Sequence, residues 1–159
     1  MINYFLKRNV QQSGVAPTDD AFTIICPNDT DVDQDGQSLI GDPDMGFNGL
    51  QQFGTLLIHK TVLKKRNHTA IHNFMIVDTP GMIDSPIEKK KNDRGYDFEG
   101  VCRWYAERAD VILLFFDPDK PGTTGETLSI LTNSLVGLDL LLLRFLEHLR
   151  MDELVVWVL

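Results

Sequence analysis

Two short apolar segments, each followed directly by an aspartate, constrain the fold of this chain more than any other feature. Residues 73–77 read Asn-Phe-Met-Ile-Val before Asp78, and residues 111–116 read Val-Ile-Leu-Leu-Phe-Phe before Asp117. Between them, apolar side chains recur at helical spacing: Phe98, Val101, Cys102, Tyr105 and Ala109. Continuous apolar strands joined through helices are typical of a parallel sheet covered on both faces. The sequence therefore predicts a three-layer α/β domain with a mostly parallel sheet.

The other elements are predicted from weaker patterns. Residues 2–8 have the spacing of one helical face, and residues 21–26 are rich in β-forming side chains, which indicates a strand. Residues 27–54 form a long stretch of Asp, Asn, Gly and Pro, of the kind that is functional or carries small elements. Residues 56–65 suggest a helix followed by a strand, with no clear boundary between them, and residues 127–135 suggest another helix.

Composition narrows the class of protein. The 159 residues carry 15 basic and 23 acidic side chains, a formal net charge of −8, and 43% of them are hydrophobic. These values are typical of one folded domain and argue against intrinsic disorder. The acidic balance argues against a general nucleic-acid binder, whose affinity comes from basic side chains. Two cysteines, Cys26 and Cys102, provide no disulfide framework.

The segment Asp78-Thr79-Pro80-Gly81 is the strongest candidate site, because ligands of parallel sheets bind at the carboxyl ends of the strands. An aspartate directly after a buried strand can hold Mg²⁺, which prefers oxygen ligands. A glycine nearby lets its backbone N–H approach a phosphate without a Cβ in the way. D-T-P-G is the switch II pattern of phosphate-binding NTPases. The alternative is an ordinary turn that ends a strand.

Four further segments give this motif a context. They are A-P-T-D-D-A-F at residues 16–22, R-G-Y-D-F at 94–98, W-Y-A-E-R-A-D at 104–110 and L-L-F-F-D at 113–117. In this order and spacing around D-T-P-G, the chain resembles the EHD branch of the dynamin-like GTPase superfamily. The resemblance covers roughly residues 1–136.

The resemblance implies a Ras-like G domain of the P-loop NTPase superfamily, from large NTPases that bind GTP or ATP with Mg²⁺, dimerise across the nucleotide and remodel membranes. By position, Thr18 would hold the magnesium ion or the attacking water, and Asp78 would be the second-shell acid of the metal. Gly81 would donate its N–H to the γ-phosphate, while Thr79 and Pro80 would shape the switch. Catalysis would consist mainly of positioning and charge stabilisation.

Three departures from the family pattern occur. The sequence contains neither G-x-x-x-x-G-K-[ST] nor N-K-x-D, and Asp19 replaces the second threonine of switch I. Because the opening residues resemble those that follow the phosphate-binding loop, we expect the chain to begin inside the first helix. We therefore expect a partial G domain over residues 1–136, incomplete at both ends, followed by a divergent apolar tail over residues 137–159.

Two functions follow from these departures. The first is a nucleotide-binding domain that, as this isolated chain, binds nucleotide poorly, since several charge-assisted phosphate contacts are lacking. The alternative is a non-catalytic interaction module, a truncated or spliced G domain that pairs with full-length relatives.

Other charged clusters favour ordinary roles. Residues 31–36 match the first half of a calcium loop, but the twelfth position is Asp42 instead of glutamate, which favours a solvated acidic turn. The basic clusters at 64–66 and 89–91 fit solubilising charge better than contact with anionic lipid. Trp104 and Cys102 fit core packing better than base stacking or nucleophilic chemistry.

No secretory pattern opens the sequence, and no apolar run reaches the roughly 18–20 residues of a membrane span. The expected location is cytoplasmic with peripheral membrane association, and an organellar location stays open. The expected partners are a nucleotide, a second copy through the G domain and a membrane surface, but no nucleic acid.

Overall fold

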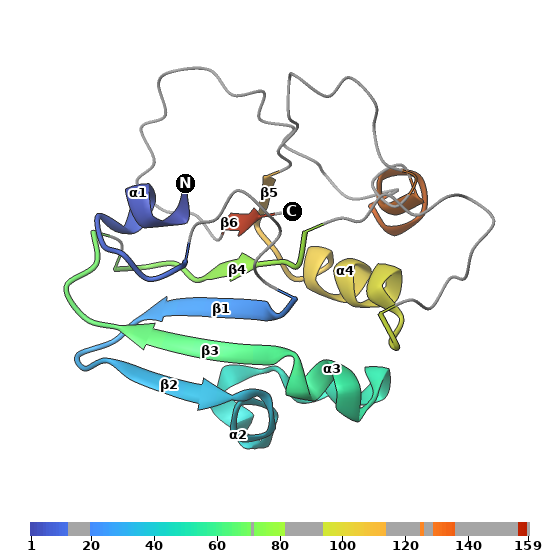
Figure 1. Cartoon of the computed structure of the whole chain (residues 1–159), viewed down its shortest axis with the longest axis horizontal. Helices are drawn as coiled ribbons and strands as arrows, with labels where there is room; N and C mark the ends of the chain where they lie inside the picture. The colour runs from blue at the N-terminus through green and yellow to red at the C-terminus, as the bar shows by residue number, and fades with distance from the viewer. Residues whose placement is uncertain are drawn as a thin grey trace.

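A computed structural model describes residues 1–12, 20–70, 72–81, 94–113, 125, 129–135 and 156–158. Within these ranges, six strands form one sheet in the order β2-β3-β1-β4-β6-β5 (Figure 1). The strands are β1 (Phe22–Pro27), β2 (Val32–Asp35), β3 (Thr61–Arg66), β4 (Ile76–Asp78), β5 (Val111–Leu113) and β6 (Val156–Val158).

The sheet is mixed. The pairs β1–β3, β4–β6 and β5–β6 are parallel, whereas β1–β4 and β2–β3 are antiparallel. The expectation of a mostly parallel sheet came from the apolar runs, which belong to the buried strands β4 and β5. It missed β2, whose sequence Val-Asp-Gln-Asp is largely exposed at the edge of the sheet. An edge strand needs no continuous apolar run, so apolar patterning gives no signal for it.

Short helices flank the sheet. They are α1 (Ile2–Leu6), α2 (Gly36–Gly41), α3 (Thr55–His59) and α4 (Phe98–Ala106), with the 3-10 helices η1 (Pro43–Met45) and η2 (Asn48–Phe53) and the π-helical turn η3 (Ile130–Ser134). The stretch 27–54 thus carries β2, α2, η1 and η2, as expected of a long irregular segment. Residues 55–66 separate into α3 and β3, a boundary that the sequence left open.

Alternation along the strands divides the core into two clusters. Ile24, Leu63 and Val77 lie side by side in the ladders and pack with α4 in the larger cluster. Ile25 and Ile76 point to the opposite face and pack against α1. Because successive strand residues face opposite sides, each face buries its own apolar set. Helices therefore pack against both faces, and the chain has the mixed α/β content that the sequence predicted.

The R-G-Y-D-F segment has a structural explanation at the start of α4. Gly95 has φ +76°, and a Cβ there would lie 2.4 Å from Leu56 Cδ2, so this turn favours glycine. Asp97 caps α4 by accepting a hydrogen bond from Gly100 N at 3.0 Å. Tyr96 and Phe98 pack with Phe22, and burial raises the pKa of Tyr96 to about 12.

The strand β6 comes from the predicted tail. It lies between β4 and β5 and is parallel to both, with Val156 level with Ile76 and Val158 level with Asp78. The sequence predicts a divergent apolar tail over residues 137–159, and the described part of it, residues 156–158, is a strand of the sheet. The rest of residues 137–159 lies outside the described residues.

Candidate functional site

Asp78 is the last residue of β4, so its carboxylate lies at the carboxyl end of a strand in the interior of the sheet. Ile76 and Val77 before it are buried, whereas Asp78 and Thr79 are half-buried. Pro80 is buried and Gly81 is exposed. The chain therefore leaves the core at Asp78 and reaches the surface at Gly81, and D-T-P-G lies at the strand end that the sequence predicted.

The carboxylate of Asp78 is bound by a side chain from the N-terminal segment. Gln11 Nε2 donates to Asp78 Oδ2 at 2.5 Å. The other end of the same amide accepts from β3, since Lys64 Nζ donates to Gln11 Oε1 at 2.6 Å. An ammonium group thus lies one side chain away from the Asp78 carboxylate and on the same face of the sheet as α1.

The backbone beyond Pro80 is held from the other side by Arg94. Its Nη2 donates to the Gly81 carbonyl at 2.6 Å, and its guanidinium lies 4.0 Å from the ring centre of Phe98. Arg94 is only 9% exposed, which is unusual for an arginine. The first residue of R-G-Y-D-F therefore fixes the last residue of D-T-P-G. We call Gln11, Lys64, Asp78, Gly81 and Arg94 the Asp78 edge.

Thr18, the predicted metal and catalytic residue, lies outside the described residues, as does Asp19. The structure thus places Asp78, Thr79, Pro80 and Gly81 together and leaves the role of Thr18 a prediction. The sequence analysis did not identify Gln11 or Lys64 as site residues, because nothing in a polar segment after a helix marks one glutamine as a partner of an aspartate 67 positions away. Arg94 could have been found, since it opens a quoted motif.

The acidic run 31–36 does not form a calcium loop. Asp31 pairs with Arg8, Asp33 pairs with Arg66 at 2.5 Å, and Asp35 caps α2 by accepting from Ser38 N at 2.8 Å. Residues Val32–Asp35 form the strand β2, so neighbouring side chains point to opposite faces. In the described part of the chain, no group of three His, Cys, Asp or Glu side chains is arranged to hold a metal ion.

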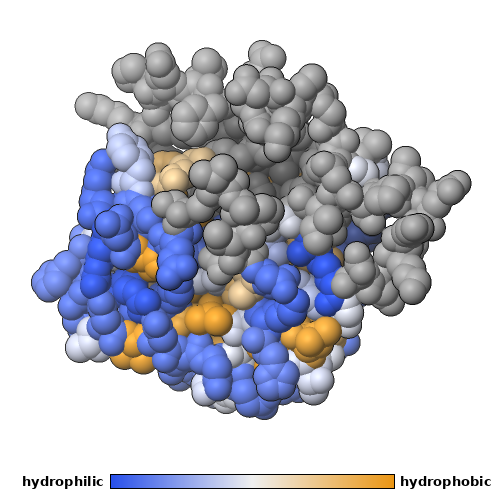
Figure 2. All heavy atoms as spheres, viewed as in Figure 1, coloured by the Kyte–Doolittle hydropathy of each residue, from blue (hydrophilic) through white to orange (hydrophobic). Residues whose placement is uncertain are grey.

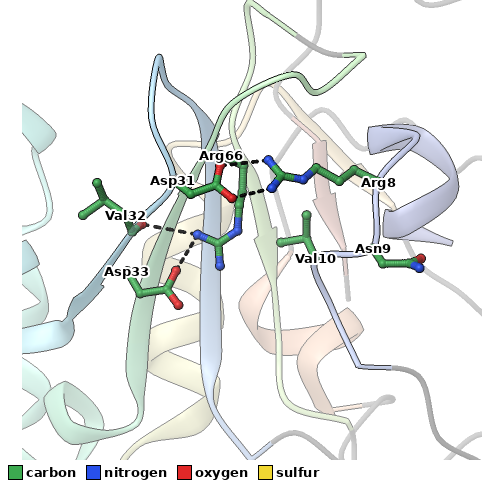
Figure 3. A pocket seen from close by; sticks show the side chains of 7 residues that line it. All are labelled: Arg8, Asn9, Val10, Asp31, Val32, Asp33 and Arg66. Carbon is green, nitrogen blue, oxygen red and sulfur yellow. Dashed lines mark hydrogen bonds and ion pairs between the residues drawn. The ribbon is translucent and has the colours of Figure 1, made fainter.

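The same ion pairs line an open pocket at the opposite end of β3 from Asp78 (Figure 3). Arg8, Asn9, Val10, Asp31, Val32, Asp33 and Arg66 line it. Arg66 bridges to the carbonyl of Val32 and to Asp33, while Arg8 reaches Asp31 and Asn67. Each arginine is matched by a carboxylate, so this ion-pair pocket offers no net charge to a charged ligand.

The side chains expected to be structural are confirmed as such. Trp104 is 7% exposed and packs edge-on against Tyr105, and Cys102 is fully buried. Lys64 and Arg66 of the first basic cluster make intramolecular contacts on β3, and the cluster at 89–91 lies outside the described residues. On the face of the molecule seen in Figure 2, the coloured residues form a mainly hydrophilic surface with small, separated hydrophobic patches.

None of the described helices is long and apolar enough to cross a membrane.

The chain has an α/β fold with D-T-P-G at the carboxyl end of an interior strand. Comparison with known proteins gives its family. No protein-family model matches the chain. The chain is 36% identical over 121 residues to EH domain-containing protein 2 of Homo sapiens, which covers 75% of this chain and 22% of that protein. It is 35% identical over 113 residues to EH domain-containing protein 1 of Arabidopsis thaliana, covering 71% of this chain and 20% of that protein.

A third relative, EH domain-containing protein 3 of Rattus norvegicus, is 33% identical over 121 residues. The chain therefore belongs to the EHD-like branch of the dynamin-like GTPases. It spans about a fifth of the length of the curated relatives it matches.

Proposed function

We propose that this chain is part of a Ras-like, nucleotide-binding G domain of a dynamin-like, membrane-remodelling NTPase that uses GTP or ATP with Mg²⁺. The observation that carries this proposal is the position of Asp78, which ends an interior strand and is followed by an exposed Gly81. The family supports it, because the EH domain-containing proteins named above are 33–36% identical to this chain over 113–121 residues. The proposed location is cytoplasmic, with peripheral attachment to membranes.

The residues present at the Asp78 edge fit a magnesium ion on chemical grounds. A carboxylate is a hard oxygen ligand, and Asp78 already accepts a hydrogen bond from an amide, as an ionised carboxylate does. Bound Mg²⁺ would neutralise charge on the phosphates. Asp78 would orient the waters around the ion, and Thr18 would contribute a hydroxyl from the other switch.

Gly81 is proposed to present its backbone N–H to the terminal phosphate. Pro80 is buried and Arg94 holds the Gly81 carbonyl, so the chain is anchored on both sides of the Gly81 N–H. A donor that is already oriented costs no reorganisation when charge develops on the phosphoryl group. Thr79 and Pro80 would set the path of the chain between the two groups.

Nucleotide affinity of the isolated chain should be low. The sequence has no G-x-x-x-x-G-K-[ST] loop, whose lysine and backbone N–H groups carry much of the affinity for the β- and γ-phosphates. Titration of the purified chain with a fluorescent GTP or ATP analogue should show no binding at micromolar concentrations. Micromolar affinity would contradict this expectation.

A chimera tests the function itself. Residues 1–136 would replace the homologous stretch of human EH domain-containing protein 2, which supplies the remainder of that protein. The proposal predicts Mg²⁺-dependent nucleotide binding that Asp78→Ala weakens at least tenfold, while Asp29→Ala, at an exposed position, leaves it unchanged. Equal affinity in both variants would remove Asp78 from the site.

The alternative proposal is a non-catalytic interaction module that pairs with full-length relatives. A formed core on both faces of the sheet supports it, because a module that pairs with another protein needs a folded surface. Analytical ultracentrifugation of the chain mixed with human EH domain-containing protein 2 distinguishes the two. A stable mixed complex without nucleotide supports the interaction module, and failure to detect such a complex contradicts it.

A further inference from the structure

Gln11 lies between two charged side chains of opposite sign that come from separate strands. Lys64 belongs to β3 and Asp78 ends β4, with β1 between these strands in the sheet. An ammonium group only donates hydrogen bonds and a carboxylate only accepts them. The amide of Gln11 can satisfy both in one orientation only, with Oε1 toward Lys64 and Nε2 toward Asp78. The contacts of 2.6 Å and 2.5 Å have this orientation.

The backbone of Gln11 is fixed independently of its side chain. Asn3 Oδ1 accepts from the backbone N–H groups of Val10 and Gln11 at 2.8 and 2.9 Å. Asn3 Nδ2 donates to the Gln11 carbonyl at 2.7 Å, and Lys64 Nζ donates to the Val10 carbonyl at 3.3 Å. A carboxamide on α1 and a lysine on β3 therefore hold the short segment that carries Gln11. A side chain on such a fixed backbone loses little further freedom when it binds Asp78.

We propose that Gln11 is a positioning residue for Asp78, and that its amide must leave the carboxylate before a divalent cation binds there. This inference rests on the proposed magnesium role of Asp78. Gln11 Nε2 occupies Asp78 Oδ2, so a cation that takes up this oxygen, directly or through a water, would displace the amide.

The coupling between the two side chains can be measured without nucleotide or metal. Urea unfolding of the full chain would be compared for the parent, Gln11→Leu, Asp78→Ala and the double variant. We expect Gln11→Leu to lower the folding equilibrium constant about tenfold when Asp78 is present, but about twofold or less in the Asp78→Ala background. The reason is that Asp78→Ala has already removed the hydrogen bond between Gln11 and the carboxylate. Gln12→Leu is the matched control, since Gln12 is the exposed neighbour.

Displacement by a cation needs a second measurement, which a merely structural role would not affect. Mn²⁺ alone would be titrated into the labelled full chain, and paramagnetic broadening of backbone NMR signals near residues 76–81 would be followed. We expect Gln11→Leu to need about tenfold less Mn²⁺ than the parent and the Gln12→Leu control for the same broadening.

The outcomes separate this inference from the proposed function. The role of Gln11 is overturned if Gln11→Leu and Asp78→Ala have additive effects on stability in the double-mutant cycle. It is also overturned if the parent and Gln11→Leu need the same Mn²⁺ concentration for the same broadening, even when Mn²⁺ broadens signals near Asp78. Broadening near Asp78 in neither protein overturns both the metal role of Asp78 and the displacement step. Coupling in the cycle together with the lower Mn²⁺ requirement supports the inference.

Discussion

The two ends of β3 hold charged side chains in opposite ways. At the ion-pair pocket, Arg8 and Arg66 each meet a carboxylate directly. At the Asp78 edge, a neutral amide separates the lysine from the carboxylate. The comparison indicates that the charges at the first end serve the fold, and we propose that the carboxylate at the second end serves a ligand.

The difference also extends to the backbone. The pocket lies on the exposed edge strand β2, where each ion pair is partly in water and adds little to stability. The Asp78 edge lies on the interior strand β4 and is supported by the buried guanidinium of Arg94. Substitutions at the second end should therefore cost far more than substitutions at the first.

The largest effect is expected for Arg94→Ala. The variant loses a charge-assisted hydrogen bond to the Gly81 carbonyl and the stacking on Phe98, which together amount to about 2–4 kcal/mol. Urea unfolding followed by circular dichroism measures the loss. Arg94→Lys keeps the charge but not the planar stack and should lose an intermediate amount. A loss below about 1 kcal/mol for Arg94→Ala would show that Arg94 does not support this edge.

A smaller effect is expected for Asp97→Ala. The variant removes the cap of α4, which accepts from Gly100 N at 3.0 Å, and should cost about 1 kcal/mol in the same assay. Asp97→Ser can still accept that hydrogen bond and should recover most of the stability. Equal losses in both variants would mean that the cost comes from the charge of Asp97 and not from capping.

The smallest effect is expected at the ion-pair pocket, and it depends on pH. The hydrogen bonds from Arg8 lower the pKa of Asp31 from 3.8 to about 2 in the folded chain. A carboxyl whose folded pKa is depressed contributes stability above its unfolded pKa, and this contribution is lost as the pH falls from about 4 to about 2.

Asp31→Asn tests this expectation directly. The variant should be slightly less stable than the parent at pH 7, and the difference in the free energy of unfolding should disappear as the pH falls from about 4 to about 2. Identical pH profiles would show that the Arg8 pair forms no stable contact in solution.

The contrast between the two ends also shows which features the sequence could predict. The strand before Asp78 and the helix at residues 98–106 follow from apolar runs and helical spacing, so β4 and α4 were expected within a few residues. The edge strand β2 was missed because its polar residues are exposed on an edge that buries little. The place of D-T-P-G at a strand end was predicted because that motif ends an apolar run.

The contacts that complete the Asp78 edge could not be predicted in the same way. Gln11 and Asp78 are 67 positions apart, and Lys64 and Gln11 are 53 apart, so only the folded sheet brings them together. Lys64 lies in the basic cluster 64–66, and its basic neighbours in the sequence favour a solubilising role over a contact with Gln11. Hydrogen bonds between polar side chains depend on exact geometry and leave no periodic pattern in the sequence.

A crystal structure of the chimera with Mg²⁺ and a non-hydrolysable GTP or ATP analogue tests the central claim most directly. We expect the Asp78 carboxylate to lie one water molecule away from the magnesium ion and the Gly81 N–H to donate to the terminal phosphate. A magnesium ion bound elsewhere, with Asp78 still hydrogen-bonded to Gln11, would contradict it.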